Sequence, residues 1–199
     1  ASAAGKAFEH IQRYILEGDC YQINFAQRFS AHFQGDAGLA YVHARKALSG
    51  PYSSFMDFGS HQVLCFSPEQ FIAIDDTEAQ TKPIKGTLPR NIDPTLDLLA
   101  ADTLRGSEKD RAENVMIVDL LRNDIGKVAA AGSVKVPSLF AIESFPAVHH
   151  LVSTVTATLV ADHNAFDLLQ AAFPGGSITG APKIRAMQII EELEPSRRN

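Results

Sequence analysis

The segment AVHHLVSTVTATLV, residues 147–160, is the longest strand-like stretch in the chain. Its odd positions from Leu151 to Leu159 are mostly apolar, whereas its even positions carry His150 and three threonines. Because successive side chains of a strand point to opposite faces, this alternation predicts one core face and one more polar face. His150 on the polar face is either a hydrogen-bonded structural group or a residue that contacts a ligand or donates a proton.

The segments on both sides of this strand show helical or period-two patterns. Apolar spacing, caps and stop residues predict helices over residues 5–19, 37–48, 93–104, 107–129, 164–173 and 183–194. Alternation and turn residues predict strands over residues 20–33, 52–59, 61–75 and 133–140. Because the strands come mostly as adjacent pairs, we expect an α+β fold of antiparallel sheets with helices on the outer faces.

Composition excludes several classes of function. The chain has 199 residues and is 45% hydrophobic, a composition typical of a globular protein. Its net charge of -5 argues against nucleic-acid binding. The sequence has no apolar run of the length that spans a membrane, and we expect no signal peptide. Cys20 and Cys65 form no zinc-binding or disulfide pattern, so we expect two reduced cysteines in the cytoplasm.

Lys85 lies in the stretch TKPIKGTLPR, residues 81–90. Pro83 and Pro89 exclude a helix interior, so the stretch is predicted to be a loop. A lysine in such a loop either provides solubility or takes part in chemistry, and the residues alone leave both open.

Glu113 lies in the long predicted helix on the same face as Ile117, Leu120 and Asp124. A carboxylate aligned with apolar residues faces at least partly inward and needs a compensating partner. That partner is either a basic side chain in an ion pair or a magnesium ion, which prefers oxygen ligands.

The stretch PGGSITGAPK, residues 174–183, contains glycines at the spacing of a phosphate-binding loop. Ala181 and Pro182 stand where such a loop requires Lys and Ser or Thr, so we reject that interpretation. The stretch is either an ordinary turn before a helix or a turn whose free N–H groups bind a carboxylate.

Six motifs in the same order resemble the chorismate-utilising family, which includes anthranilate, aminodeoxychorismate, isochorismate and salicylate synthases. They are GDCYQIN (18–24), SPEQF (67–71), PIKGT (83–87), DRAENVMIVDLLRNDIGKV (110–128), FPAVHHLVST (145–154) and AAFPGGSITGAPKIRAM (171–187). The resemblance implies two orthogonally packed antiparallel sheets in one chorismate-binding catalytic domain over residues 1–199. Lysine in PIKGT, where anthranilate synthases typically have alanine, is similar to the aminodeoxychorismate synthase component I branch.

The resemblance also implies a role for each matching residue. Lys85 is expected to attack carbon 2 of chorismate as a nucleophile, Glu69 to act as general acid and base, and His150 to lie near the ring. Glu113 is expected to bind Mg²⁺. Substrate contacts are implied for Thr87, Ser177, Thr179, Gly180 and Lys183.

The implied product is 4-amino-4-deoxychorismate, the precursor of p-aminobenzoate and folate, formed with ammonia from a glutamine amidotransferase partner. The family domain continues with strands that carry a second metal-binding glutamate and an arginine, so the chain is expected to lack its C-terminal segment and to have little activity alone. The alternatives are an anthranilate synthase component I and an inactive fragment that only docks the amidotransferase.

Overall fold

The structure is a computed structural model that describes residues 3–48 and 50–198. Two compact units are formed. One holds the described residues up to Arg28 together with those from Ile72 onwards, and the other holds Phe29–Phe71.

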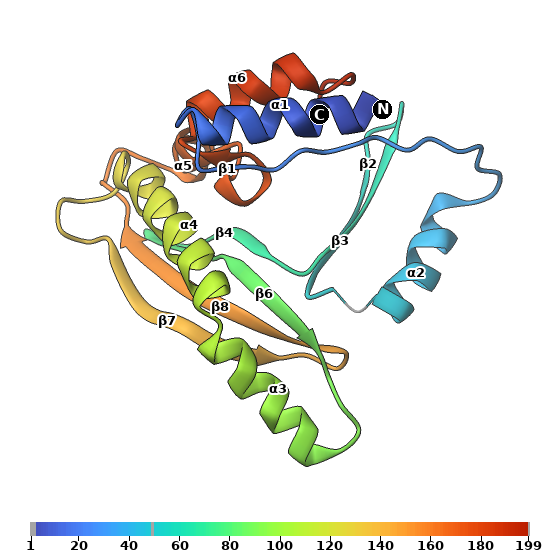
Figure 1. The fold of residues 1–199 in the computed structure, drawn as a ribbon, viewed down its shortest axis with the longest axis horizontal. Coiled ribbons are helices and arrows are strands. Elements are labelled where there is room, and N and C mark those ends of the chain that lie inside the picture. The colour runs from blue at the N-terminus through green and yellow to red at the C-terminus, as the bar shows by residue number, and fades with distance from the viewer. Residues whose placement is uncertain (1–2, 49, 199) are drawn as a thin grey trace. The chain divides into compact units, whose positions relative to one another are not determined.

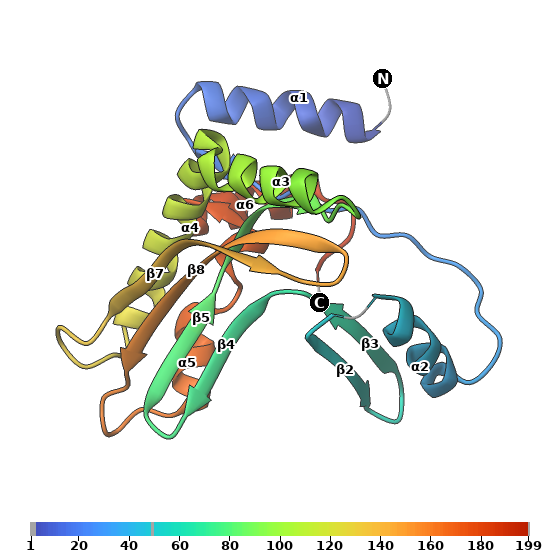
Figure 2. The same ribbon diagram turned by 90° about the horizontal axis from the view of Figure 1, so that it is seen from below.

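A five-stranded sheet forms the centre of the larger unit, and β8 (Val148–Thr158) runs through it. β5 (Glu78–Lys82) and β6 (Ile84–Pro89) pair end to end along one edge of β8, both antiparallel. β7 (Lys135–Ser144) pairs antiparallel with the other edge, and β4 (Gln70–Asp75) continues the sheet beside β5. β8 is therefore hydrogen-bonded on both sides along its length (Figure 2).

Residues 81–90 were expected to form a loop, and this expectation is wrong. Most of the stretch belongs to β5 and β6, with Pro83 between them. The missing N–H of Pro83 costs no ladder bond at the break, while its carbonyl still accepts a hydrogen bond of 3.2 Å from Ser153 N.

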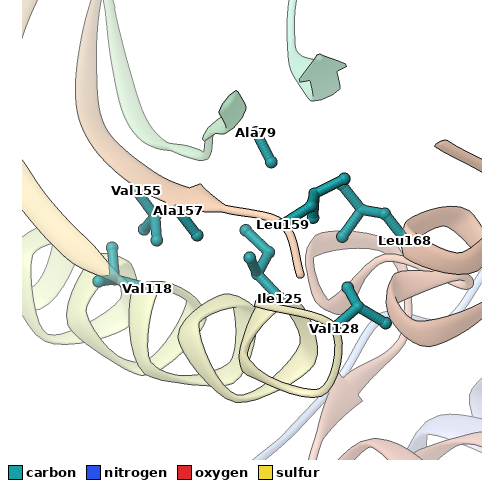
Figure 3. Close-up of a cluster of buried hydrophobic side chains, with 8 residues drawn as sticks. All are labelled: Ala79, Val118, Ile125, Val128, Val155, Ala157, Leu159 and Leu168. Atoms are coloured by element: carbon teal, nitrogen blue, oxygen red, sulfur yellow. The ribbon is translucent and has the colours of Figure 1, made fainter. Parts of the chain in front are cut away.

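The predicted alternation of faces is confirmed from Ser153 to Thr158, whereas the residues from His149 to Val152 are buried on both faces of β8. Leu151, Ser153 and Val155 are fully buried at 0% exposure on the helix-facing side. This side packs against α4 (Glu108–Gly126) and α5 (Ala165–Ala172). The cluster of buried hydrophobic side chains between these elements is drawn in Figure 3: Ala79, Val118, Ile125, Val128, Val155, Ala157, Leu159 and Leu168.

Two helices follow one another across the sheet, α3 (Pro94–Gly106) and α4 (Figure 1). Asp93 caps α3 by accepting hydrogen bonds from the N–H groups of its first turn. Ser107 caps α4 by accepting from Asp110 N at 3.3 Å, as its position before the helix predicts. These caps fix where both helices begin over the sheet.

A polar cluster fixes α3 to the end of the sheet. Arg90 donates two hydrogen bonds to Asp97 through Nε and one through NH2, at 2.7–3.0 Å, and His149 Nε2 lies 3.0 Å from Asp97 Oδ1. The Arg90 guanidinium, with a backbone N–H from Asn91, holds the pKa of Asp97 well below its usual range. The arrangement joins β6, α3 and β8 next to His150.

Two segments from far apart in the chain complete the larger unit. β1 (Gln22–Ile23) pairs antiparallel with β9 (Gly180–Ala181) after a short 3₁₀ turn, η1 (Gly176–Ile178). α1 (Ala3–Leu16) contacts α6 (Lys183–Leu193), which runs alongside it in Figure 1. One of these contacts joins Tyr14 and Glu192, whose hydroxyl and carboxylate are 2.9 Å apart.

The smaller unit holds α2 (Ala37–Leu48) and the hairpin of β2 (Tyr52–Asp57) and β3 (Gln62–Ser67). Tyr41 of α2 packs on this hairpin, with ring centroids 5.7 Å from Phe55 and 5.3 Å from Phe66. The sequence predicted this strand pair and its turn, but the single strand predicted over residues 61–75 is wrong, because it is divided into β3 and β4, which belong to different sheets.

The strand predicted over residues 20–33 is mostly wrong. Only Gln22–Ile23 is a strand, because its pairing partner, Gly180–Ala181, is equally short. Phe29 and Phe33, expected on a buried face, are 86% and 61% exposed. Alternation without a neighbouring strand to complete the ladder is not sufficient for a strand.

The α+β class with antiparallel pairing is confirmed. The orthogonal packing of two sheets stays a prediction. Within the described ranges every helix is too short or too polar to cross a lipid bilayer.

Candidate active site

Lys85 is half-buried at a bulge in β6. Ile84 pairs with Val152 and Thr87 pairs with His150, so Lys85 and Gly86 together face a single residue of β8. Gly86 has a φ of 86°, a conformation that glycine adopts readily and other residues rarely do.

Gly86 also brings β6 against the helices. A Cβ atom on Gly86 would lie 2.8 Å from Leu104 Cδ1 and 2.9 Å from Asp110 Cγ. Only glycine allows this approach, so the backbone next to Lys85 is held against the end of α3 and the first turns of α4.

Glu113 lies on α4 one turn after Asp110 and is half-buried. Leu120, on the same side of the helix, meets the glycine-rich turn, because a Cβ on Gly176 would lie 2.7 Å from Leu120 Cδ2. Asp110, Glu113 and Leu120 fall within about 80° of arc at 3.6 residues per turn. Glu113 is therefore positioned between the contact with β6 and the contact with the turn.

Two half-buried charges remain unpaired in this region. Across residues 3–48 and 50–198, neither the Lys85 ammonium nor the Glu113 carboxylate has an ion-pair or hydrogen-bond partner. An ion pair for Glu113 is thus not formed within the described chain, while nearby Lys82 does pair with Glu143 at 2.5 Å. Unpaired, partly buried charges of opposite sign on contacting elements are suited to binding a polar ligand.

His150 is buried, with 8% exposure, and its Nδ1 lies 2.8 Å from Thr87 Oγ1. Burial lowers the pKa of His150, and the charge of Glu143 on the neighbouring strand offsets part of this. The imidazole is therefore neutral at pH 7, and Thr87 fixes the orientation of the ring. The structure brings Thr87, His150 and the Lys85 bulge together on adjacent strands.

The glycine-rich turn is closely packed. Thr179 is 3% exposed, and its hydroxyl donates to Gly175 O at 2.9 Å. Gly180 has a φ of 151°, and a Cβ there would lie 2.1 Å from Gln22 O. No larger residue fits at Gly180, which explains why β9 lies so close to β1.

Lys183 follows the turn, and its ammonium binds inside the protein. It donates to Asp124 and to Ala172 O, the latter at 2.8 Å. Asp124 is 2% exposed and is also bonded by Lys127 at 2.9 Å. The arrangement joins the start of α6 to α4 and α5, so the Lys183 charge is engaged by a buried carboxylate.

Glu69 belongs to the smaller unit and is half-buried. Its N–H donates to Ser67 Oγ at 3.2 Å, and that hydroxyl donates back to Glu69 O at 3.0 Å, which forms a local turn after β3. Its position beside Lys85 stays a prediction.

A cavity of about 330 Å³ borders the glycine-rich turn. Phe173, Pro174, Ile178, Met187 and Arg198 are among its lining residues. Thr179 is the one sequence-predicted site residue in its lining, so this cavity is separate from the Lys85 bulge and His150.

Comparison with known proteins decides the family. The family model described as chorismate binding enzyme matches residues 5–199. The chain belongs to the chorismate-binding enzyme family.

Relatives within this chorismate-binding family include synthases of two kinds. Aminodeoxychorismate synthase component 1 of Escherichia coli (strain K12) is 60% identical over 98% of this chain and 43% of its own length. Anthranilate synthase component 1 of Aquifex aeolicus (strain VF5) is 42% identical over 94% of this chain and 38% of its own. The crystal structure of anthranilate synthase component I from Streptococcus pneumoniae TIGR4 superposes with a TM-score of 0.87 at 37% identity, covering 97% of this chain and 42% of that one. The chain thus spans less than half the length of these relatives.

The metal site implied by the family is only partly represented. Among the described residues, no group of three or more His, Cys, Asp or Glu side chains is arranged to hold a metal ion. Glu113 contributes one unpaired carboxylate, which fits one oxygen ligand of Mg²⁺ but does not form a site by itself.

Sequence reasoning gave no role to Glu143 or to Asp124 as the partner of Lys183. Glu143 is opposite His150 in the register of β7 and β8, which is a tertiary property. Asp124 lies on the inward face of its helix, and a buried acid on that face signals a nearby lysine or arginine.

Proposed function

We propose that this chorismate-binding chain forms the chorismate site of an aminodeoxychorismate synthase component 1, which converts chorismate and ammonia to 4-amino-4-deoxychorismate and water. The observation that supports this most is Lys85, a half-buried and unpaired ammonium at a bulge beside His150. The identity of 60% to the relative of that name supports the same branch.

In the proposed reaction, the neutral Lys85 amine forms a bond to carbon 2 of chorismate while the ring double bond shifts and the bond from carbon 4 to its hydroxyl breaks. Glu69 protonates the departing hydroxyl, which leaves as water. Ammonia then adds at carbon 4, the double bond shifts back, and the bond to Lys85 breaks, which returns the free amine. The new ammonium group at carbon 4 gives one proton back to Glu69. Lys85 is suited to this role because, within the described chain, no ion pair holds its side chain away from a ligand.

His150 is proposed to lie against the ring, with its orientation set by Thr87. A neutral imidazole beside a dianionic substrate offers a donor or acceptor without requiring a charge in a buried position. Because burial lowers the pKa of His150, this state holds through the neutral pH range.

Glu113 is proposed as one ligand of Mg²⁺, which when bound would offset the charge of a substrate carboxylate. A glutamine amidotransferase subunit is proposed as the ammonia source, and the relatives' name, component 1, supports the existence of a second component. The proposed setting is cytoplasmic synthesis of p-aminobenzoate for folate.

The test uses the full-length protein with chorismate, Mg²⁺ and ammonium salt, so that no partner is needed. We expect Lys85→Ala to lower the rate of aminodeoxychorismate formation at least about 10³-fold, the scale of losing a covalent catalyst. Mass spectrometry of the parent should show a chorismate-derived mass on the peptide that holds Lys85. Lys135→Ala, at an exposed position in β7, is the matched control and should retain activity.

Two outcomes would overturn this proposal. Unchanged product formation by Lys85→Ala removes Lys85 from the mechanism. Fluorescent anthranilate, formed directly by the parent, would assign the chain to the anthranilate synthases, which the relative from Aquifex aeolicus keeps as the second candidate.

A further inference from the structure

Asn24, at the end of the GDCYQIN motif, donates two hydrogen bonds to backbone carbonyls of the glycine-rich turn. Its N–H donates to Thr179 O at 2.7 Å, and its side-chain Nδ2 donates to Ser177 O at 2.5 Å. Its own carbonyl accepts from the Arg198 guanidinium, which also donates to Ile178 O. One asparagine and one arginine therefore bind three consecutive carbonyl groups of the turn.

The arginine in this arrangement is itself fixed. Arg198 pairs with Glu194, one turn earlier, at 2.5 Å from NH2 to Oε1, and Glu194 also accepts from Ala26 N at 2.7 Å. The Arg198 guanidinium holds the pKa of Glu194 below its ordinary value, so the pair stays charged through the neutral range. The Asn24–Arg198 clamp, defined as these two residues and their bonds to residues 177–179, is thus anchored to the end of α6.

The clamp sets the direction of the peptide between Thr179 and Gly180. A trans peptide is planar, and its C=O and N–H point to opposite sides. Because Thr179 C=O is directed at Asn24, the N–H of Gly180 points away from β1. The carbonyl oxygens of residues 177–179, which would repel an anion, each accept a hydrogen bond from the clamp.

Two side chains at the turn already bind within the protein, so we consider the backbone N–H groups as the anion-binding groups. The Thr179 hydroxyl already donates to Gly175 O, and the Lys183 ammonium is held by Asp124. An anion that arrives at the turn therefore meets oriented N–H dipoles in place of a free lysine, and its affinity depends on how rigidly those dipoles are held.

We propose that Asn24 is a positioning residue that orients the Thr179–Gly180 peptide to bind a carboxylate of the substrate, with Arg198 as its support. This inference rests on the proposed function, because it takes chorismate as the ligand. Asn24 itself does not contact the substrate and acts through the turn.

The test compares Asn24→Asp with the parent in the full-length protein. The substitution keeps the shape of the side chain but replaces the Nδ2 donor with an acceptor that repels Ser177 O. We expect the KM for chorismate to rise about 10-fold or more, the scale of losing one hydrogen bond to a charged group, while kcat changes less than about 3-fold. Asn164→Asp is the matched control, because the Asn164 side chain accepts a hydrogen bond from Phe166 N at a helix N-cap and aspartate preserves that bond.

A second readout does not depend on turnover. Chorismate should slow amide hydrogen exchange in the peptide that covers residues 177–181 of the parent, and Asn24→Asp should lose most of that protection. Arg198→Gln, which keeps a shorter donor, should show the same changes to a smaller degree and replaces Asn24→Asp if that variant does not fold.

The outcomes separate the two proposals. A folded Asn24→Asp variant with an unchanged KM, or with kcat reduced in proportion, overturns the positioning role alone. A parent that neither binds chorismate nor shows protection overturns the proposed function, and the positioning role with it.

Discussion

Two lysines in the larger unit stand in opposite situations. Lys85 lies at a bulge in β6 with no charged partner in the described chain, whereas Lys183 is bound to the buried carboxylate of Asp124. Both lie in proline- or glycine-containing motifs, and the resemblance implied a nucleophile at Lys85 and a substrate contact at Lys183. The difference shows that a lysine in a proline- or glycine-containing motif is available for chemistry only where the fold leaves its charge uncompensated.

The strongest test of this comparison replaces each lysine by methionine, which keeps roughly the length of the side chain but removes the charge. Lys183→Met leaves Asp124 buried with only Lys127, so we expect the free energy of unfolding to fall by about 3 kcal/mol. Lys85→Met loses no ion pair, so its free energy of unfolding should stay within about 0.5 kcal/mol of the parent value. Urea denaturation measures both, and equal losses would contradict the distinction.

Gly86 at the Lys85 bulge and Gly176 in the glycine-rich turn are constrained differently, and replacing them should change the free energy of unfolding by smaller amounts. Gly86→Ala places a Cβ in the left-handed region and within 3.0 Å of Leu104 and Asp110, so we expect a loss of about 2 kcal/mol. Gly176→Ala has an ordinary φ and meets only the ends of the flexible Leu120 side chain, so about 1 kcal/mol or less is expected. Thermal unfolding of the two variants should rank them in this order, and a larger loss for Gly176→Ala would show that the turn is the tighter of the two.

The smallest expected effect concerns pH. The pKa of His150 is lower in the folded protein than the ordinary value of about 6.5, so the unfolded chain binds the proton more readily. The free energy of unfolding should therefore decrease as pH falls through 6.5 and level off below the folded pKa. His150→Gln should show a shallower decrease over pH 5–8, and an identical slope would mean that His150 does not titrate differently on folding.

The sequence predicted most where a local pattern coincides with a layer of the fold. The period-two pattern of residues 147–160 identified the two faces of β8 from Ser153 to Thr158, and the cap at Ser107 placed the start of α4. Residues 20–33 carry the same kind of pattern but have a pairing partner for only two residues. Whether a strand forms depends on its neighbour, and that neighbour lies far along the chain.

The candidate site was predicted less completely. Glu113 and His150 were selected by the faces they occupy, and the structure places them on the elements that contact the Lys85 bulge and its strand. The resemblance supplied Lys85 and Glu69, while local patterns read the Lys85 segment as a loop. No pattern revealed that Asp124 holds Lys183 or that Asn24 binds the turn, because each of these contacts joins segments at least 59 residues apart.

The contact between Asn24 and Ser177 spans 153 residues of chain, and that between Asn24 and Arg198 spans 174. During synthesis on the ribosome, the strand that holds the turn emerges long before the turn itself exists. Closing so long a loop carries a large entropic cost, and distant pairings are slow to form. Anion recognition at this turn should therefore be among the last properties that a newly made chain acquires.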